Sequence, residues 1–219
     1  MKKIPSLFQR NYDTDRLVRD EVVPGSEWVL AGEGVATVKI DGTACMIKDG
    51  KLYKRYDRKP LKHKSVLLSA LTKGLSELVT EYKSAPAGWI PCEDGPDENT
   101  GHWPGWLPVG DGPDDKWHRD VFIPSTGFSD GTYELVGPKV QGNPYGLDGH
   151  ALLRHGEPLE PEPNRTFEGL KGWFNTTVEG EPDGRVVHPI EGIVWHHPDG
   201  RMVKIKRKDF GLPWPIKDK

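Results

Sequence analysis

Thr37-Val38-Lys39-Ile40-Asp41-Gly42 is the stretch that decides the fold prediction for this 219-residue chain. It lies in an alternating, β-branched run from Val35 to Ile47, which predicts a strand that breaks at Asp41-Gly42. Because Lys39 precedes Asp41 by two residues, both side chains emerge on the same side of an extended backbone. The pattern K-x-D-G thus presents an amine and a carboxylate together. Taken alone, Asp41-Gly42 is equally typical of a simple turn.

Further charged residues follow in strand-like runs. The runs are Tyr53-Lys54-Arg55, Gly131 to Gly137 around Glu134, Ile190 to Val194 around Glu191, and Met202 to Lys206 with Lys204 and Lys206. A lysine, an arginine, two glutamates and a final Lys-x-Lys, in that order, resemble the motif series of covalent nucleotidyltransferases, and in particular of polynucleotide ligases. In those enzymes the lysine attacks the α-phosphate of a nucleotide and carries it as a phosphoramide.

The types of residue fit this chemistry. Glu134 and Glu191 lie in mostly apolar runs, where a carboxylate is costly unless it is paired. One would serve ribose hydroxyls and the other a metal; the alternative is an edge strand with the glutamate in solvent. Lys204 and Lys206 share one face of their strand, and two like charges there need an anion such as a triphosphate. The alternative is a solvated strand face.

Composition narrows the function classes. Net charge is −3, so no global field attracts nucleic acid, but basic residues cluster from Lys51 to Lys64 and from Lys204 to Lys208. We find no signal peptide, no membrane-spanning run and too few cysteines for a disulfide scaffold, so we expect a cytoplasmic, reduced, soluble protein. Glycine (26) and proline (20) are spread along the chain, which is typical of a turn-rich β protein.

The pattern along the chain predicts few helices. We expect a hairpin at Asp49-Gly50 with a returning strand Leu52 to Tyr56, a helix capped by Ser65 and running to Tyr82, and an ordered, aromatic-packed loop from Ala85 to Pro124. After it we expect strands at 131–136, 150–153, 186–187, 191–196 and 202–206, and a short helix at 167–177. The turn His197-Pro198-Asp199-Gly200 would place Glu191 and Lys204 on neighbouring strands.

Several longer segments resemble the RNA ligase 1 family of small ATP-dependent 5′-to-3′ RNA ligases. They are Lys39 to Cys45, Arg55 to Pro60, Gly88 to Cys92, Gly101 to Trp106, Gly142 to Gly146 and Glu191 to His196. The resemblance runs from about Val35 to Trp214. It implies an α+β nucleotidyltransferase domain with two mainly antiparallel sheets flanking an ATP cleft. We therefore expect one domain over residues 1–219, with no appended C-terminal domain.

The resemblance also implies roles for individual residues. Lys39 would accept AMP, and Asp41 and Lys204 complete the catalytic set. Glu191 and Asp41 would hold Mg²⁺ or Mn²⁺, and ATP supplies the nucleotide. The nucleotide-binding set is Val38, Lys39, Arg55, Glu134, Glu191, Lys204 and Lys206. Arg55 would contact phosphate or the RNA end. Because the basic run continues through Arg58 and Lys59, we expect Arg55, Arg58 and Lys59 to contact RNA with 5′-phosphate and 3′-hydroxyl ends.

The alternatives within enzymes are a DNA ligase and a capping guanylyltransferase, which use the same lysine nucleophile. The alternative outside enzymes is a non-catalytic nucleic-acid-binding relative that keeps the fold. The complete motif set argues against the last, because a non-catalytic protein has no need of the lysine. The oligomeric state is open, with a monomer favoured.

Overall fold

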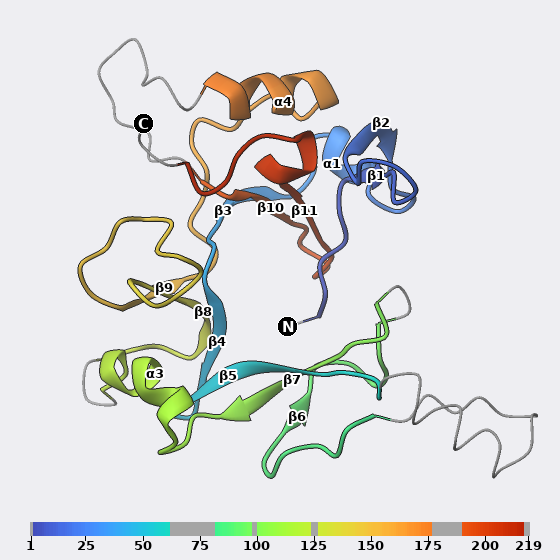
Figure 1. The fold of residues 1–219 in the computed structure, drawn as a ribbon. Coiled ribbons are helices and arrows are strands. Elements are labelled where there is room, and N and C mark those ends of the chain that lie inside the picture. The colour runs from blue at the N-terminus through green and yellow to red at the C-terminus, as the bar shows by residue number, and fades with distance from the viewer. Residues whose placement is uncertain (1, 62–81, 98–99, 124–126, 177–189, 217–219) are drawn as a thin grey trace, which may run out of the picture. The chain divides into compact units, whose positions relative to one another are not determined.

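The computed structural model describes residues 2–61, 82–97, 100–123, 127–176 and 190–216. These residues form a mixed α+β fold with few helices and several antiparallel sheets (Figure 1), which confirms the predicted fold class. The chain divides into two compact units, one of Met1–Lys3 with Thr43–Tyr133 and one of Ile4–Gly42 with Glu134–Lys219. The expectation of a single domain over residues 1–219 stays a prediction.

A three-stranded antiparallel sheet forms the centre of the second unit. Its strands are β3 (Val35–Lys39), β10 (Gly192–His196) and β11 (Met202–Lys206), in the order β11-β10-β3. Short main-chain pairings cover both outer strands: Ser6 bridges Lys204 of β11, and Pro158 bridges Thr37 of β3. The predicted strands at 35–39 and 202–206 are confirmed, and β10 starts one residue later than predicted.

This sheet has one apolar and one polar face. Ala36 of β3, Ile193 and Trp195 of β10, and Val203 and Ile205 of β11 belong to the buried core, with at most 4% of each exposed. Their neighbours in sequence alternate with them and therefore point to the opposite face. That opposite face carries Lys39, Lys204 and Lys206.

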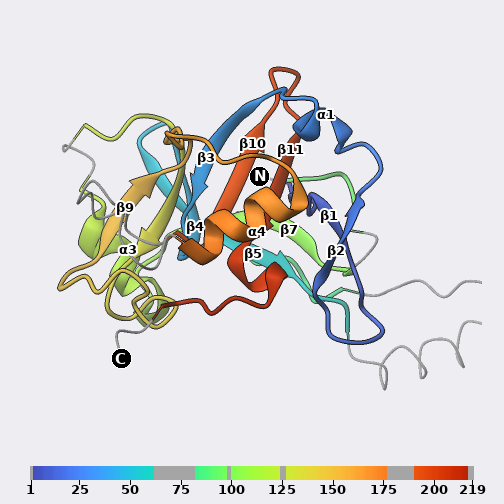
Figure 2. The same ribbon diagram turned by 90° about the horizontal axis from the view of Figure 1, so that it is seen from above.

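Helix α4 (Phe167–Thr176) covers the apolar face (Figure 2). Its Leu170 and Phe174 are fully buried against the sheet residues. The remaining elements of this unit are β1 (Phe8–Arg10) and β2 (Val18–Val22), which pair as a hairpin, α1 (Glu27–Leu30), β9 (Ala151–Arg154), and the turn η3 (Arg207–Phe210). Phe8, Trp28 and Phe210 from these elements complete the core.

The first unit contains the other large sheet. Its strands are β4 (Thr43–Lys48), β5 (Lys51–Arg58), β6 (Ile90–Pro91) and β7 (Trp103–Pro108), in the order β6-β7-β5-β4, with the start of β8 (Gly131–Val136) next to β4. The hairpin predicted at Asp49-Gly50 joins β4 to β5. Strand β8 passes into the second unit at Glu134, where β9 is its neighbour.

The prediction of a loop from Ala85 to Pro124 was wrong. This segment contains β6, β7, the turn η1 (Pro113–Asp115) and the helix α3 (Lys116–Val121). Strand β7 has the sequence Trp-Pro-Gly-Trp-Leu-Pro, which local rules score as non-strand. Six residue pairs with β5 hold it extended, so tertiary pairing overrides propensity. The predicted packing by aromatic residues is confirmed, because Trp89 and Trp103 meet edge to face at 5.6 Å and Trp106 is buried.

Two predicted elements lie outside the described residues. These are the helix that begins at Ser65, of which only Tyr82 is described, and the short strand at Val186-Val187. The predicted helix at 167–177 corresponds to α4, and the strand predicted at 150–153 corresponds to β9, one residue later.

Candidate active site

The pairing register of the three-stranded sheet places Lys39 and Lys206 in one row of paired residues and Lys204 in the next row. Lys39 and Lys206 both pair with Gly192 of the central strand, and Thr37 and Lys204 both pair with Val194. Residues that pair directly point to the same face. The nucleophile candidate Lys39 therefore shares a face with both lysines of the Lys-x-Lys motif, as the sequence predicted for Lys204 and Lys206.

Glu191 joins two of these lysines. Its Oε2 lies 2.5 Å from Lys39 Nζ, and its Oε1 lies 3.2 Å from Lys206 Nζ. The glutamate is only 6% exposed, which excludes the alternative of a solvent-facing carboxylate on an edge strand. Gly192, between the two lysines, has no side chain to separate them.

Lys204 is the lysine whose ionisation is most strongly perturbed. Burial, together with the neighbouring positive charges of Lys206 and Lys39, lowers its pKa from 10.5 to about 8. No carboxylate within the described residues forms an ion pair with its Nζ, in contrast to Lys39 and Lys206. Three cations on one face with a single bridging carboxylate leave excess positive charge, which a phosphate group would neutralise.

Asp41 lies just beyond the end of β3. Its Oδ2 accepts a hydrogen bond from Trp214 Nε1 at 2.8 Å, and its main-chain N–H donates to Tyr145 Oη at 2.7 Å. Burial raises the pKa of Tyr145, and the nearby carboxylates, among them Glu191, add to the effect. Asp41, Glu191 and Tyr145 therefore surround a common region of this unit.

Gly42, the residue after Asp41, packs so closely against β8 that a side chain has no room there. A Cβ on Gly42 would lie 2.2 Å from the carbonyl oxygen of Leu135 and 2.7 Å from Cγ of Glu134. Any side chain would push the K-x-D-G turn away from β8, so glycine keeps Asp41 close to Glu134.

Glu134 is buried, at 8% exposed, and is paired with a residue that the sequence did not indicate. Its Oε2 lies 2.8 Å from Nε2 of His155, directly after β9. The other ring nitrogen of His155, Nδ1, is buried and has no hydrogen-bond partner within the described residues. As for Glu191, the alternative of a solvent-facing glutamate is excluded.

The predicted RNA-binding residues belong to the other unit. Arg55 forms an ion pair with Asp57 at 2.5 Å and lies over the ring of Trp106. Arg58 lies 5.1 to 5.7 Å from the ring centroids of Tyr82, Trp89 and Trp103, and it donates to the carbonyl of Lys83. Lys59 is exposed. Arg58 thus has a structural role beside any contact with RNA.

Val38 is placed apart from the other predicted nucleotide-binding residues. It alternates with Lys39 and points to the opposite face of the sheet, and its N–H donates to the carbonyl of Glu157 at 3.0 Å. Its predicted contact with the nucleotide stays a prediction.

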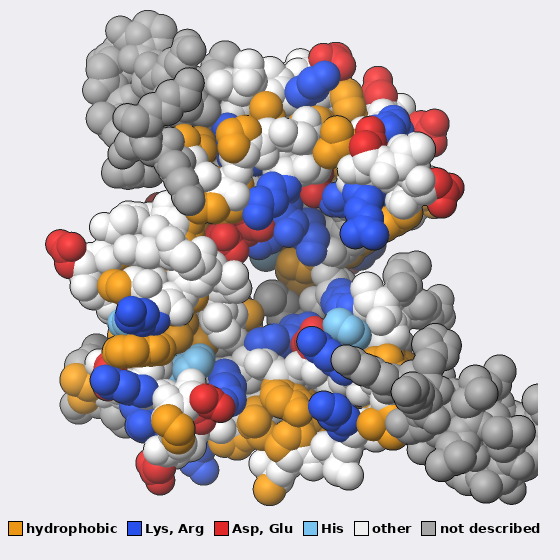
Figure 3. Space-filling view, in the orientation of Figure 1, with side chains coloured by type: hydrophobic (Ala, Val, Ile, Leu, Met, Phe, Trp, Pro, Cys, Tyr) orange, Lys and Arg blue, Asp and Glu red, His pale blue; other side chains and the backbone are white. Residues whose placement is uncertain are grey.

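The surface agrees with this distribution of charge. In Figure 3, Lys and Arg side chains gather over the region where β10 and β11 lie, with acidic side chains beside them. Within the described residues no group of three His, Cys, Asp or Glu side chains is arranged to hold a metal ion. Metal binding through Glu191 and Asp41 alone would therefore need further ligands from substrate phosphates and water.

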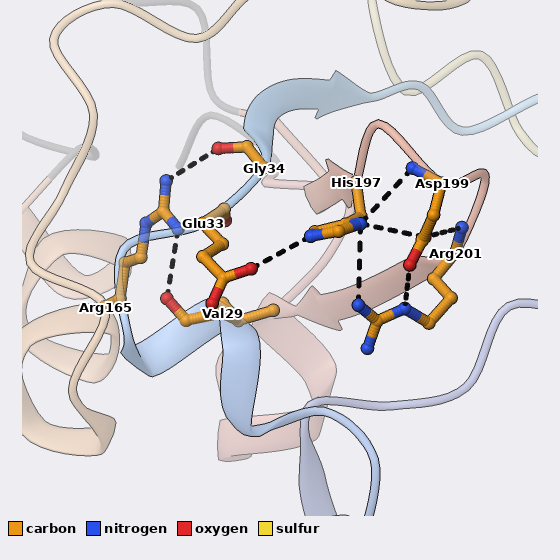
Figure 4. A network of polar contacts seen from close by, with 7 residues as sticks. All are labelled: Val29, Glu33, Gly34, Arg165, His197, Asp199 and Arg201. Atoms are coloured by element: carbon orange, nitrogen blue, oxygen red, sulfur yellow. Dashed lines mark hydrogen bonds and ion pairs between the residues drawn. The ribbon is translucent and has the colours of Figure 1, made fainter.

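The turn between β10 and β11 is fixed at the far end of the strands (Figure 4). Nε2 of His197 donates a hydrogen bond to the carboxylate of Glu33 at 2.9 Å, and the ring forms an ion pair with Asp199 at 2.8 Å. Arg165 donates to the carbonyls of Val29 and Gly34 near α1, each at 3.0 Å. These contacts fix the turn that joins β10 to β11 and the chain that leads into β3.

Sequence reasoning missed Tyr145, Trp214 and His155. Tyr145 and Trp214 lie within the stretch that resembles the family, and a buried Tyr or Trp needs a partner for its polar tip. That rule signals a hydrogen bond but not its partner, because Asp41 is 104 and 173 residues away from them.

Comparison with known proteins shows the family of this chain. The model of the RNA ligase 1 family matches residues 114–219. Proteins named RNA ligase 1 from Pongo abelii and Mus musculus are 32% and 33% identical to the chain in alignments 234 positions long, which cover 84% of this chain and 69% of theirs. The Danio rerio protein of that name is 33% identical over 233 residues, with the same coverage. No helix within the described residues has the length and apolar character to cross a bilayer. On its motifs, its site and these relatives, the chain belongs to the RNA ligase 1 family.

Proposed function

We propose that this protein is an ATP-dependent RNA ligase that joins 5′-phosphate and 3′-hydroxyl ends through an AMP carried on Lys39. The observation that carries the proposal is that Lys39 and Lys206, bridged by the Glu191 carboxylate, share one face of a single sheet with Lys204 in the next row. The names of the relatives support RNA as the substrate class.

In the first step the neutral amine of Lys39 attacks the α-phosphorus of ATP. A nitrogen–phosphorus bond forms, the bond to the β-phosphate oxygen breaks, and pyrophosphate leaves. Lys39 must first give up a proton, and Glu191 would accept it; the distance of 2.5 Å between Glu191 Oε2 and Lys39 Nζ supports this role. Lys206, on the other oxygen of Glu191, keeps that carboxylate oriented.

Lys204 would stabilise the negative charge that develops on the α-phosphate. Its stem is partly buried, and both its main-chain groups are bonded to the N-terminal segment, N–H to Pro5 and C=O to Leu7. A cation held this way is preorganised and needs little rearrangement during the reaction. Glu134 would accept hydrogen bonds from the ribose hydroxyls, replacing or sharing its contact with His155.

Asp41 and Glu191 would supply carboxylate ligands to Mg²⁺, but not a complete set of ligands. Carboxylate oxygens suit this ion, which is usually held by one or two carboxylates together with substrate phosphates. When bound, the ion would neutralise phosphate charge.

In the later steps AMP passes from Lys39 to the 5′-phosphate of RNA. The 3′-hydroxyl then attacks that phosphate, AMP leaves, and the strand is sealed. Arg55 and Lys59 remain the proposed contacts for the RNA end, because they belong to the basic run in the first unit.

Labelling with [α-³²P]ATP and Mg²⁺ tests the first step. The wild type should gain a labelled protein band and the mass of one AMP, and Lys39→Ala should gain neither. Lys39→Arg should also fail, because a guanidinium stays protonated. Lys208→Ala, which removes an exposed lysine outside the site, is the matched control and should label as the wild type does. Labelling that persists in Lys39→Ala would contradict the proposed nucleophile.

Substrate choice separates the alternatives. A capping guanylyltransferase would be labelled by GTP in preference to ATP. A DNA ligase would seal a nick in an all-DNA duplex at least as well as an RNA nick. We expect labelling by ATP and preferential sealing of RNA ends held together by base pairing, with little dependence on sequence.

A further inference from the structure

Two aromatic residues from distant parts of the chain converge on Asp41. Trp214 comes from the segment that follows η3, and Tyr145 comes from the loop between β8 and β9. Their rings meet at 63° with centroids 6.0 Å apart. One donates to the Asp41 carboxylate and the other accepts from the Asp41 main chain. Both polar parts of this residue are thereby held in place, two positions from Lys39.

The segment that carries Trp214 is itself tied to the active site. The buried side chain of Arg207 donates from Nε to the carbonyl of Pro213 at 3.2 Å and from a terminal nitrogen to the carbonyl of Phe174 in α4 at 2.5 Å. Its main-chain N–H donates to the carbonyl of Glu191 at 2.9 Å. Arg207 therefore links the position of Trp214 to that of the glutamate that pairs with Lys39.

The loop that carries Tyr145 is also ordered by specific contacts. Asn143 forms two hydrogen bonds with Leu147 through its side-chain amide, at 2.9 and 3.0 Å. Gln141 donates to the carbonyl of Gly42 at 3.3 Å. Gln141 and Asn143 both adopt positive φ, at 48° and 55°. Such conformations are costly for residues other than glycine, so the surrounding contacts must hold them.

We propose that Trp214 and Tyr145 are positioning residues for the adenylylation step: they fix the carboxylate and backbone of Asp41 relative to Lys39. This inference rests on the proposed function. The hydrogen bond from Trp214 occupies Oδ2 of Asp41 and sets the direction of Oδ1, which has no hydrogen-bond partner within the described residues. Oδ1 is then the oxygen presented to the nucleotide phosphates and their metal-bound water.

The test compares Trp214→Phe with Trp28→Phe. Both tryptophans are 6% exposed in the same unit, but Nε1 of Trp28 has no hydrogen-bond partner within the described residues. The two exchanges remove similar buried aromatic area, whereas only Trp214→Phe removes a hydrogen bond to a carboxylate. Tyr145→Phe serves as a second variant, because it removes the hydroxyl that accepts from the N–H of Asp41.

The measurement is the time course of lysyl-AMP formation at saturating ATP with enzyme in excess over a single turnover. Its amplitude reports the fraction of folded, active protein, and its rate constant reports the geometry of the site. We expect Trp214→Phe and Tyr145→Phe to lower the rate constant roughly 10-fold, as the loss of one hydrogen bond to a charged or buried group would do. Trp28→Phe should keep the wild-type rate constant.

The outcomes are distinct. An unchanged rate constant in Trp214→Phe, whatever its amplitude, overturns the positioning role, as does an equal decrease in Trp28→Phe. If the wild type and Trp28→Phe form no lysyl-AMP at all, the proposed function itself fails. Melting temperatures of the three variants, measured alongside, identify any loss of fold.

Discussion

Replacing Lys204 by methionine should make the protein more stable and abolish its adenylylation. The lysine lies beside Lys206 and Lys39, and burial is the largest cause of its lowered pKa. Methionine has a stem of similar length and no charge, so the exchange removes the desolvated ammonium while it keeps most of the packing. A residue placed for chemistry is thus expected to lower the stability of the fold.

The lowered pKa of Lys204 sets the size of this gain in stability. A fall from 10.5 to about 8, at about 1.4 kcal/mol for each pKa unit, means that the charged form costs the fold about 3 kcal/mol at pH 7. Solvent around the partly exposed side chain screens this cost, so we expect Lys204→Met to raise the free energy of unfolding by about 1–2 kcal/mol.

The pH dependence follows from the direction of the change. Between pH 8 and 10.5 the folded protein has released the Lys204 proton and the unfolded chain still binds it. The contribution of this group to wild-type stability therefore rises with pH in that window. The advantage of Lys204→Met should accordingly shrink as pH rises from 8 towards 10.5.

Urea unfolding at pH 7 and at pH 9.5 measures both effects. Lys208→Met is the matched control, because Lys208 is an exposed lysine close by in η3, and its exchange should change stability by less than about 0.5 kcal/mol. Lys204→Met should also form no lysyl-AMP. A variant that is less stable than the wild type at pH 7, or equally stabilised at both pH values, would refute the reasoning.

Three more predictions concern other parts of the molecule. Gly42→Ala should lower the free energy of unfolding by about 2 kcal/mol or more in a denaturant titration, because its Cβ meets a main-chain oxygen at 2.2 Å. The hydrogen bond that His197 donates to Glu33 raises the pKa of His197, so its stabilising contact is fully present below pH about 6.5 and is lost as pH rises through the folded value. The melting temperature of His197→Gln should therefore fall below that of the wild type by more at pH 5.5 than at pH 8.5. Lys59→Ala should still form lysyl-AMP but seal pre-adenylylated RNA poorly, and its deficit relative to the wild type should be largest at low salt, because the variant has lost one salt-sensitive phosphate contact. Arg58→Ala should in addition lower the melting temperature, because it removes the cation that packs between aromatic rings. Sealing by Lys59→Ala at the wild-type rate at every salt concentration would remove the basic run from the RNA path.

The alternation of apolar and polar residues made the outer strands of the three-stranded sheet predictable. In β3 and β11 apolar residues recur at every second position, so both strands and the shared face of Lys204 and Lys206 follow from the period of two. Strand β7 was not predictable, because Pro104, Gly105 and Pro108 are local signals against a strand. Its extended form depends on pairing with β5, which no local pattern reports.

Some residues of the candidate site were likewise predictable from the sequence, and others were not. Lys39, Glu191 and Lys204 were found because their chemistry requires particular residue types in a particular order. Trp214 and Tyr145 were missed because each acts through one hydrogen bond to a residue more than a hundred positions away. Aromatic residues are common in cores, so nothing in their local sequence separates a hydrogen-bonding role from simple packing.

The two-faced sheet has a consequence for how this sequence can diverge. In β11, Val203 and Ile205 are constrained by packing in the core. Lys204 and Lys206 are constrained by the charged groups on the opposite face. Apolar residues can exchange in the first set without altering the second, so the two sets can drift separately. Insertion or deletion of one residue is different, because it would carry every side chain beyond it to the wrong face. Apolar exchanges should therefore be tolerated at Val203 and Ile205 while Lys204, Lys206 and the length of the strand stay fixed.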